Sequence, residues 1–413
     1  MSDTASARDT ARVRDAVHAS SRELRDLSVF MHDHVETAFE EHQAADAVTG
    51  LLERHGFEVE RGLSGYDTAF RGTIGAAGPS ATIAFVCEYD GLPPYGHSCG
   101  HNVSTASSAG AGLAIGPLAA RLGIQVQVIG TPGEEGGGGK YRMADEGVFD
   151  GVDAAMLVYP GMYDIGASRS LGARAVRVEF TGKAAHASAH PELGVNALDA
   201  MVTGFTSLGL LRQQLPPEVR VHGIITDGGT LPMVVPDRTS ATLIVRAGSA
   251  AATDAAVARV AACFQAAALA TGAAVQVTPA GTMAEPLLPN PPLAGAFDDA
   301  MRSLGREPRG TDMSGGAWSG DSGYLSHVVP LIQPQVRLTD ETIPPHSLEF
   351  HQATVGPAAL ETITAAAQAM ALTGLKIATD PALLRDIRKE FAERRKRDAD
   401  HMPRHMGSGL PPG

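Results

Sequence analysis

The densest group of side chains able to do chemistry lies in the segment CEYDGLPPYGHSCGHN, residues 87–102. Cys99 and His101 are separated by a single glycine, so a flexible loop can turn both side chains toward one ion. Thiolate and imidazole ligands suit borderline transition metals such as zinc, manganese or cobalt. The alternative is a free cysteine beside a loop histidine. Asp90 precedes the pair and is placed to orient a ligating imidazole by accepting its ring N–H.

Two adjacent carboxylates, Glu134 and Glu135, stand in a second segment, GTPGEEGGGGK at residues 130–140. They follow a predicted strand and precede four glycines, so the two side chains can serve different partners. In metal-assisted hydrolysis one carboxylate binds the ion, while a free carboxylate accepts a proton from the water that the ion acidifies. A solvated acidic turn is the alternative. Phosphate binding is disfavoured, because Lys140 is followed by Tyr141 and not by the Ser or Thr of a P-loop.

Two further histidines are weaker candidates. His186 follows a predicted strand within TGKAAHASAHPELGVNALDA, residues 181–200, and His346 lies within IPPHSLEF, residues 343–350. Considered alone, each is more typical of a surface histidine than of a metal ligand. Spacing by itself therefore assigns them no role.

The elements that must position these residues alternate between helices and strands. Apolar residues at helical spacing predict two helices between residues 15 and 56. Residues 81–90 and 124–135 are predicted strands that break into Gly, Pro and acidic residues, with a small-residue helix at 107–123 between them. A third strand is predicted at 154–161. This alternation predicts an open, mostly parallel α/β sheet with its chemistry at the carboxyl ends of the strands.

The pattern changes near residue 171, where a second kind of domain is predicted. Strand, helix, strand, strand, helix and strand follow in this order at 173–182, 196–215, 219–229, 239–249, 252–272 and 274–281. This order resembles a ferredoxin-like α+β sandwich. A proline-rich linker follows, and after it the pattern of the first domain resumes, with a helix, a glycine-rich loop and a strand. We therefore expect a catalytic domain made of residues 1–171 and 285–413, ending in a basic tail, and an inserted domain at 172–284.

The composition limits the classes of function. The chain has 413 residues, 33 Lys and Arg against 46 Asp and Glu, a net charge of −13, and 44% apolar residues. That apolar fraction is ordinary for a globular protein of two or three domains, and the acidic balance argues against nucleic-acid binding. No stretch resembles a signal peptide or a membrane span, and the three cysteines are scattered, so we expect a cytoplasmic protein without membrane contact.

Taken in order, several segments resemble motifs of the aminoacylase-type metallopeptidase superfamily. The motifs are EYDGLP with GHSCGHN, GTPGEEGGGG, GKAAHASAHP, HGIITDGGTLPMVVPD, and SGDSGYLSHVVPLIQP leading to PPHSLEF. The likeness covers roughly residues 20 to 375. Within the superfamily, the most similar branch comprises the amidohydrolases that act on hippurate, indole-acetyl-amino acids and p-aminobenzoyl-glutamate.

This resemblance implies a catalytic domain that binds one or two divalent ions, manganese or zinc. It also implies that the inserted domain forms a homodimer, or a larger assembly of dimers, and closes over the substrate as a lid. The motif positions of metal ligands are occupied by four residues: Cys99, His101, Glu135 and His346. By the same matching, Glu134 is the general base, Asp90 orients a ligand, and His186 polarises the substrate, often from across the dimer.

The chain departs from the family pattern at the expected substrate pocket. Where the family usually has a ligating histidine followed by proline, this chain has Tyr159 followed by Pro160. A neutral phenol with a pKa near ~10 is a poor ligand, so one of the two metal positions is expected to be weakened. Met233 stands in place of the family's asparagine, and Gln333 in place of a histidine. We therefore expect the chemistry to be retained while the substrate has changed.

One specialised relative has this character, and it converts 5-nitroanthranilate to 5-nitrosalicylate and ammonia. From overall likeness to that relative we expect release of nitrogen from a small aromatic acid, with this reaction as its most specific version. An aryl amine is a reluctant leaving group, so the anionic ring needs donors, for which Arg337, His186 and Tyr159 are candidates. The expected substrate-binding residues are Tyr159, Met233, Gln333 and Arg337. Hydrolysis of an N-acyl amino acid or a p-aminobenzoyl-glutamate type amide is the alternative, and a metal-free dimeric binding protein is the alternative from another class.

Overall fold

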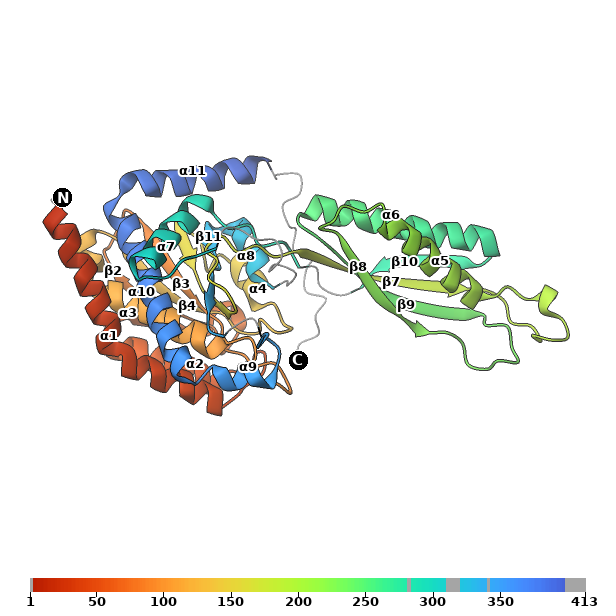
Figure 1. Ribbon diagram of the computed structural model, residues 1–413, viewed down its shortest axis with the longest axis horizontal. Coiled ribbons are helices and arrows are strands. Elements are labelled where there is room, and N and C mark those ends of the chain that lie inside the picture. The colour runs from red at the N-terminus through yellow and green to blue at the C-terminus, as the bar shows by residue number, and fades with distance from the viewer. Residues whose placement is uncertain (1–2, 281–283, 310–319, 340–341, 398–413) are drawn as a thin grey trace. The chain divides into compact units, whose positions relative to one another are not determined.

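Helices and strands alternate along the chain in the computed structural model, which describes residues 3–280, 284–309, 320–339 and 342–397. The chain divides into two units (Figure 1). The first contains the residues up to Arg169 and those from Leu287 onward, and the second contains Ser170–Pro286. The second unit therefore begins two residues before the insert expected at 172–284 and ends two residues after it.

The first unit is built around a six-stranded sheet. Its strands lie in the order β1 (Glu58–Arg61), β2 (Phe70–Gly75), β4 (Gln125–Gly130), β3 (Thr82–Cys87), β5 (Ala154–Met156) and β11 (Leu331–Ile332). The last four of these strands are parallel neighbours, as the sequence pattern predicts for β3 and β4. β1 and β2 add an antiparallel hairpin at one edge, which the sequence pattern did not indicate.

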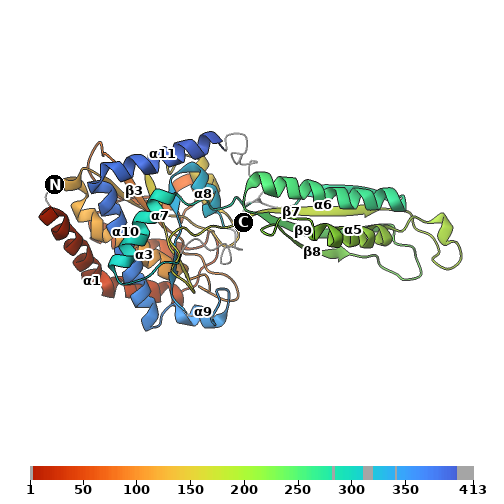
Figure 2. The same ribbon diagram turned by 45° about the horizontal axis from the view of Figure 1, so that its top comes forward.

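Helix α3 (His101–Leu122) packs on this sheet, and its small residues let it approach closely. A Cβ at Gly112 would lie 2.4 Å from Val128 of β4, so a larger residue does not fit there. The helix begins six residues earlier than predicted, which makes His101 its first residue. α1 (Asp3–Asp33) and α10 (Pro357–Thr379) pack in turn on α3 (Figure 2).

The remaining helices of the first unit are α2 (His42–Arg54), α4 (Gly139–Asp145), α7 (Pro291–Ser303), α8 (Ser322–Val328), α9 (Leu348–Ala353) and α11 (Pro381–Arg397). α11 is the start of the predicted basic tail, and the rest of the tail lies outside the described residues. In the described part of the chain, none of the helices combines the length and the apolar character that a membrane span requires.

The prediction of a single strand at 154–161 is wrong, because two short strands occupy this range. β5 ends at Met156, and Tyr159–Gly161 forms β6, which pairs with β12 (Gln335–Arg337) in a separate two-stranded sheet. Leu157 and Val158 separate the two strands, and Pro160 lies within β6 opposite Val336. Tyr159 therefore does not continue the main sheet, but lies in the segment that follows β5.

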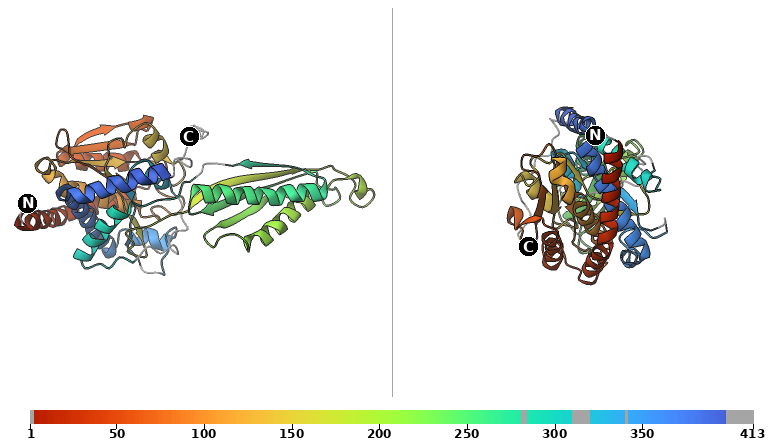
Figure 3. Two further views of the ribbon diagram at one scale, coloured as in Figure 1. Left: turned by 90° about the horizontal axis from the view of Figure 1, so that it is seen from above. Right: turned by 90° about the vertical axis from the view of Figure 1, so that its left-hand side faces the viewer.

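The second unit has the predicted βαββαβ order. It consists of β7 (Gly172–Thr181), α5 (Ala197–Arg212), β8 (Arg220–Asp227), β9 (Arg238–Ala247), α6 (Ala250–Thr271) and β10 (Ala274–Pro279). The strands form an antiparallel sheet in the order β10-β7-β9-β8, the arrangement of a ferredoxin-like sandwich. Buried residues alternate along β9 because α5 and α6 pack against the sheet (Figure 3).

Candidate metal centre

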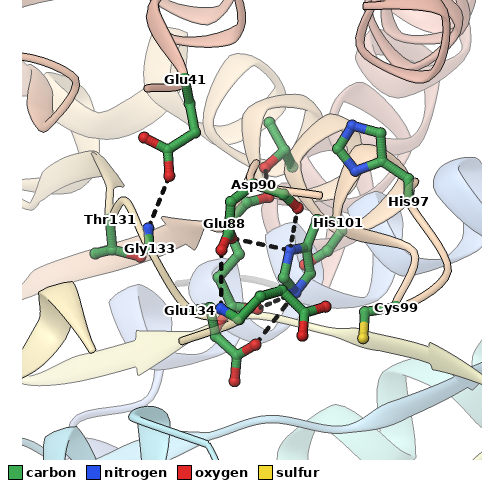
Figure 4. A network of polar contacts seen from close by, with 12 residues as sticks. Glu41, Glu88, Asp90, His97, Cys99, His101, Thr131, Gly133 and Glu134 are labelled. Carbon is green, nitrogen blue, oxygen red and sulfur yellow. Dashed lines mark hydrogen bonds and ion pairs between the residues drawn. The ribbon is translucent and has the colours of Figure 1, made fainter. Parts of the chain in front are cut away.

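The two predicted clusters meet at the carboxyl ends of neighbouring strands. Asp90 and Cys99 follow β3, and Glu134 and Glu135 follow β4. Because β3 and β4 are parallel neighbours, the segments after them leave the sheet at the same edge. Figure 4 shows the side chains of Glu88, Asp90 and Glu134 around His101, the first residue of α3.

The four ligand candidates fall into two overlapping groups. In one group, single donor atoms of Cys99, Glu135 and His346 all lie within 4.8 Å of one another. In the other, donor atoms of His101, Glu134 and Glu135 meet the same limit. Glu135 belongs to both groups, so its carboxylate is placed to join two adjacent sites.

His101 is oriented by Asp90. Its Nδ1 lies 2.8 Å from the Asp90 backbone oxygen and 3.2 Å from Asp90 Oδ1, so Nδ1 carries a proton and donates it. Nε2 faces the carboxylates of Glu88 and Glu134 at 3.8 Å and 3.7 Å. Burial alone would lower the pKa of His101, but its contacts with Asp90 and the charge of Glu88 raise it well above the usual value. A hydrogen-bonded Nδ1 and an Nε2 aimed at anionic groups are typical of a ligating imidazole.

The charges and donor atoms of the site fit a divalent transition ion. Burial and the Glu88 carboxylate raise the pKa of Glu134 well above its usual value, and burial and Glu135 raise the pKa of the Cys99 thiol. These groups resist ionisation together, and a cation among them would relieve that repulsion. Glu135 Oε1 is buried and has no hydrogen-bond partner among the described residues, which leaves it free to ligate. Sulfur, nitrogen and oxygen donors of this kind suit zinc or manganese.

His346 reaches the site in a strained backbone conformation. Its φ of 66° lies in the left-handed region, which residues other than glycine rarely adopt. Its backbone N–H donates to the Ser98 oxygen at 2.9 Å, and its Nε2 lies 2.8 Å from Cys99 Sγ. Strain of this kind costs about 1–3 kcal/mol and persists only where the surroundings fix it. The fold thus holds His346 against the loop that carries Cys99.

Tyr159 lies close to the ligand candidates. Burial raises its pKa well above the usual value, and the nearby Cys99 and Glu134 raise it further. The raised pKa favours the neutral form of the phenol, which is a poor metal ligand. The phenol lies beside the candidate ligands, and the weakening of one metal position stays a prediction.

The other expected substrate-binding residues fall in two places. Gln333 is buried just before β12, and Arg337 is the last, exposed residue of that strand, which pairs with the strand of Tyr159. Met233 lies in the second unit, where its backbone oxygen accepts the Ala187 N–H at 3.1 Å. The structure thus groups Gln333 and Arg337 with Tyr159, and it groups Met233 with the segment of His186.

His186 presents one defined hydrogen-bond donor. Its Nδ1 accepts the backbone N–H groups of Ser188 at 3.4 Å and Ala189 at 3.2 Å. Because Nδ1 accepts, the ring proton of the neutral imidazole lies on Nε2. The side chain is exposed within the second unit, so Nε2–H is available to an incoming oxygen.

Lys140 is the principal site residue that sequence reasoning missed. Its Nζ is fully buried and lies 2.7 Å from Glu88 Oε1 and 2.7 Å from Asp321 Oδ1. Ser322 donates to the same Glu88 oxygen at 3.3 Å. The ammonium thus fixes the carboxylate whose other oxygen faces His101. A lysine directly after the glycine run is the signal that could have revealed it.

Known proteins resemble this chain in sequence. The chain is 35% identical to the Xaa-Arg dipeptidase of Mus musculus over 394 residues, 92% of this chain and 91% of that protein. It is 34% identical to one component of the p-aminobenzoyl-glutamate hydrolase of Escherichia coli (strain K12) over 259 residues, 57% of this chain and 53% of that protein.

A solved structure shares the fold. The Bacillus subtilis YXEP protein, described as a dinuclear metal binding peptidase from the M20 family, matches with a TM-score of 0.71 at 19% identity. The match covers 87% of this chain and 99% of that one. The pattern of peptidase family M20/M25/M40 extends over residues 79–371, which include both carboxylate loops and His346. The chain therefore belongs to peptidase family M20/M25/M40.

Proposed function

We propose that the chain is a metal-dependent hydrolase that cleaves the amide or peptide bond of a small acyl- or aminoacyl-amino acid. The observation that carries this proposal is the pair of overlapping donor groups that share Glu135, one of which also includes the Glu134 carboxylate. The Xaa-Arg dipeptidase and the p-aminobenzoyl-glutamate hydrolase to which the chain is similar are named for reactions of this class.

The residues of the site divide the work of hydrolysis. Four residues would hold one or two ions of manganese or zinc: Cys99, His101, Glu135 and His346. Such an ion lowers the pKa of water and polarises a carbonyl group. Glu134 accepts the proton that water loses on attack and delivers it to the leaving nitrogen. His186 offers Nε2–H to the substrate oxygen that gains negative charge.

Removal and return of metal test this proposal. Purified protein is stripped with a chelator and reloaded with manganese or zinc, and cleavage of dipeptides, N-acyl amino acids and p-aminobenzoyl-glutamate is measured. We expect no turnover after stripping and recovery after reloading. If the reloaded protein cleaves none of these compounds and releases no ammonia from 5-nitroanthranilate, the proposal is wrong, and a metal-free binding protein becomes the better account.

Release of ammonia from 5-nitroanthranilate is a second candidate, and Tyr159 is the observation that favours it. The neutral phenol stands where the family usually has a ligating histidine, so the carboxylate of an aromatic acid can complete the coordination. Arg337 and His186 supply donors for the anionic ring. Ammonia release from 5-nitroanthranilate without cleavage of the amide panel would select this reaction over the first.

We expect Tyr159→His to bind metal at least about tenfold more tightly than the unchanged chain, a difference of about 1.4 kcal/mol. The imidazole supplies a neutral nitrogen ligand where the phenol supplies none. Competition with a coloured chelator measures the affinity. Tyr159→Phe is the control, because it removes the hydroxyl without adding a ligand. Equal affinity in the His and Phe variants would contradict the missing-ligand argument.

We also propose that β8 joins two copies of the chain into a homodimer. β8 is the edge strand of the second unit's sheet, and its Ile224 and Ile225 are 67% and 41% exposed. A bare apolar edge strand is a template for pairing with another strand. Antiparallel pairing of β8 with its copy is compatible with a twofold axis, since each contact of residue i in one copy with residue j in the other is then matched by a contact of j with i.

Ile224→Lys is expected to convert the dimer to a monomer, because a lysine on an edge strand opposes strand pairing. Light scattering on the eluted protein measures the mass. Leu269→Lys is the matched control, since Leu269 is 89% exposed on α6 and lies away from β8 in the same unit. A monomeric unchanged chain, or an Ile224→Lys variant that remains dimeric, would rule out β8 as the interface.

A further inference from the structure

A buried carboxylate from outside the two predicted clusters reaches the loop of Glu134. Glu41 is fully buried at the N-terminus of α2, yet its side chain does not cap that helix. Its Oε1 accepts the Gly133 N–H at 2.8 Å, and its Oε2 accepts the Thr68 hydroxyl at 2.9 Å. Figure 4 shows the Glu41 carboxylate directed at Gly133, beside the converging carboxylates. Both oxygens of this buried carboxylate thus accept hydrogen bonds from outside its own helix.

Phe39, two residues before Glu41, packs on the same loop. Its ring stacks on Tyr66, with ring centroids 4.8 Å apart. A Cβ at Gly133 would lie 2.7 Å from the ring, and a Cβ at Gly137 would lie 2.0 Å from it. The glycines of this loop are therefore needed for the ring to sit against it. The segment before α2 thus holds the loop by packing as well as by hydrogen bonding.

A second buried carboxylate holds the other side of Glu134. Asp90 Oδ2 accepts the backbone N–H of Glu135 at 2.8 Å. The residues before and after Glu134 therefore each donate a backbone N–H to a buried carboxylate, Glu41 on one side and Asp90 on the other. Hydrogen bonds to an ionised acceptor are roughly twice as strong as neutral ones. Between these two anchors the Glu134 side chain has little freedom to move away from the donor groups.

We propose that Glu41 is a positioning residue for Glu134. It acts through the Gly133 N–H, which fixes the loop so that the Glu134 carboxylate stays beside His101 and Glu135. This inference rests on the proposed function, in which Glu134 transfers the proton. Its expected size follows from geometry, because a misplacement of about 1 Å can cost about 10²-fold in rate.

The test compares Glu41→Ala with Glu41→Gln. Alanine removes the acceptor, whereas glutamine keeps an oxygen that can accept the Gly133 N–H. We expect Glu41→Ala to lower kcat by about 10²-fold with KM and metal content unchanged, and Glu41→Gln to restore kcat to within about tenfold. Glu36→Ala is the matched control, because Glu36 accepts the N–H groups of Gln43 and Ala44 and so serves only α2 through its side chain. It is expected to lower stability and keep kcat.

Hydrogen exchange in the metal-free protein supplies a readout apart from activity. We expect peptides that cover residues 131–139 to exchange faster in Glu41→Ala than in the unchanged chain, and Glu36→Ala to leave them unchanged. Equal kcat and equal exchange in Glu41→Ala and the unchanged chain would overturn the inference. An inactive unchanged chain would count against the proposed function, and the exchange result would still decide the role of Glu41. If Glu41→Ala does not fold, Glu41→Asp replaces it, because the shorter side chain withdraws the carboxylate from Gly133. The same two measurements, kcat and hydrogen exchange of residues 131–139, then decide the role of Glu41.

Discussion

Glu134→Gln is expected to retain metal and to lose turnover by about 10²–10⁴-fold. The amide has nearly the same size as the carboxylate but cannot accept a proton at neutral pH. The side chain is only 17% exposed, and its Oε2 lies 3.7 Å from His101 Nε2, so the replacement leaves the surroundings filled. Measurement of kcat and of metal content on the same preparation separates loss of the base from loss of the ion.

Glu135→Gln is the matched comparison, because it makes the same chemical change one residue away. Glu135 belongs to both donor groups, so its variant is expected to lose metal first and activity as a consequence. The reverse pattern, with metal lost in Glu134→Gln and kept in Glu135→Gln, would exchange the two roles. Full activity of Glu134→Gln would remove Glu134 as the base.

Much of the fold follows from local patterns, and the exceptions have local causes. β3, β4 and the six elements of the second unit are marked by runs or alternation of apolar residues, which are properties of neighbouring positions. β1 escaped prediction because EVER carries three charged residues and is mostly exposed. The strand at 154–161 was extended too far because apolar residues continue without interruption through Leu157 and Val158, which separate β5 from β6.

The residues of the candidate site also differ in how far they could be recognised from neighbouring positions in the sequence. Cys99 with His101, and Glu134 with Glu135, could be recognised because each pair is nearly adjacent in the chain. His346 could be assigned only through resemblance to a family, since it lies 247 positions from Cys99. Lys140 was missed because a charged residue in a sequence looks the same whether it is solvated or buried. Its environment depends on Asp321, which lies 181 positions away.

That environment makes the stability of the site sensitive to one lysine. Burial alone would lower the pKa of Lys140, but Asp321 and Glu88 raise it above its usual value, so the buried ammonium stays charged. The ammonium therefore balances the charge of two buried carboxylates, Glu88 and Asp321. Each of these side chains is only 2% exposed. Glu88 also faces His101, which links the ion pair to the metal centre.

Lys140→Met is accordingly expected to lower the free energy of unfolding by about 3–5 kcal/mol, because it leaves buried carboxylates without their cation. Methionine fills a similar volume, so the loss reflects charge more than packing. Arg142→Met on the same helix is the control. Arg142 Nε lies 2.8 Å from Glu146, but both side chains are nearly half exposed, so solvent screens the pair and its loss is expected to cost much less than loss of the buried pair.

Urea unfolding of the two variants, measured in metal-free buffer, compares the same type of substitution in a buried and an exposed ion pair. Equal losses would show that the contacts of Lys140 with Glu88 and Asp321 contribute no more than a surface pair. The expected difference, several kcal/mol in favour of Lys140, would show that the carboxylate facing His101 is held by an internal cation before any metal binds. The protein would then carry within its first unit the cation that holds Glu88 in place beside the candidate ligands.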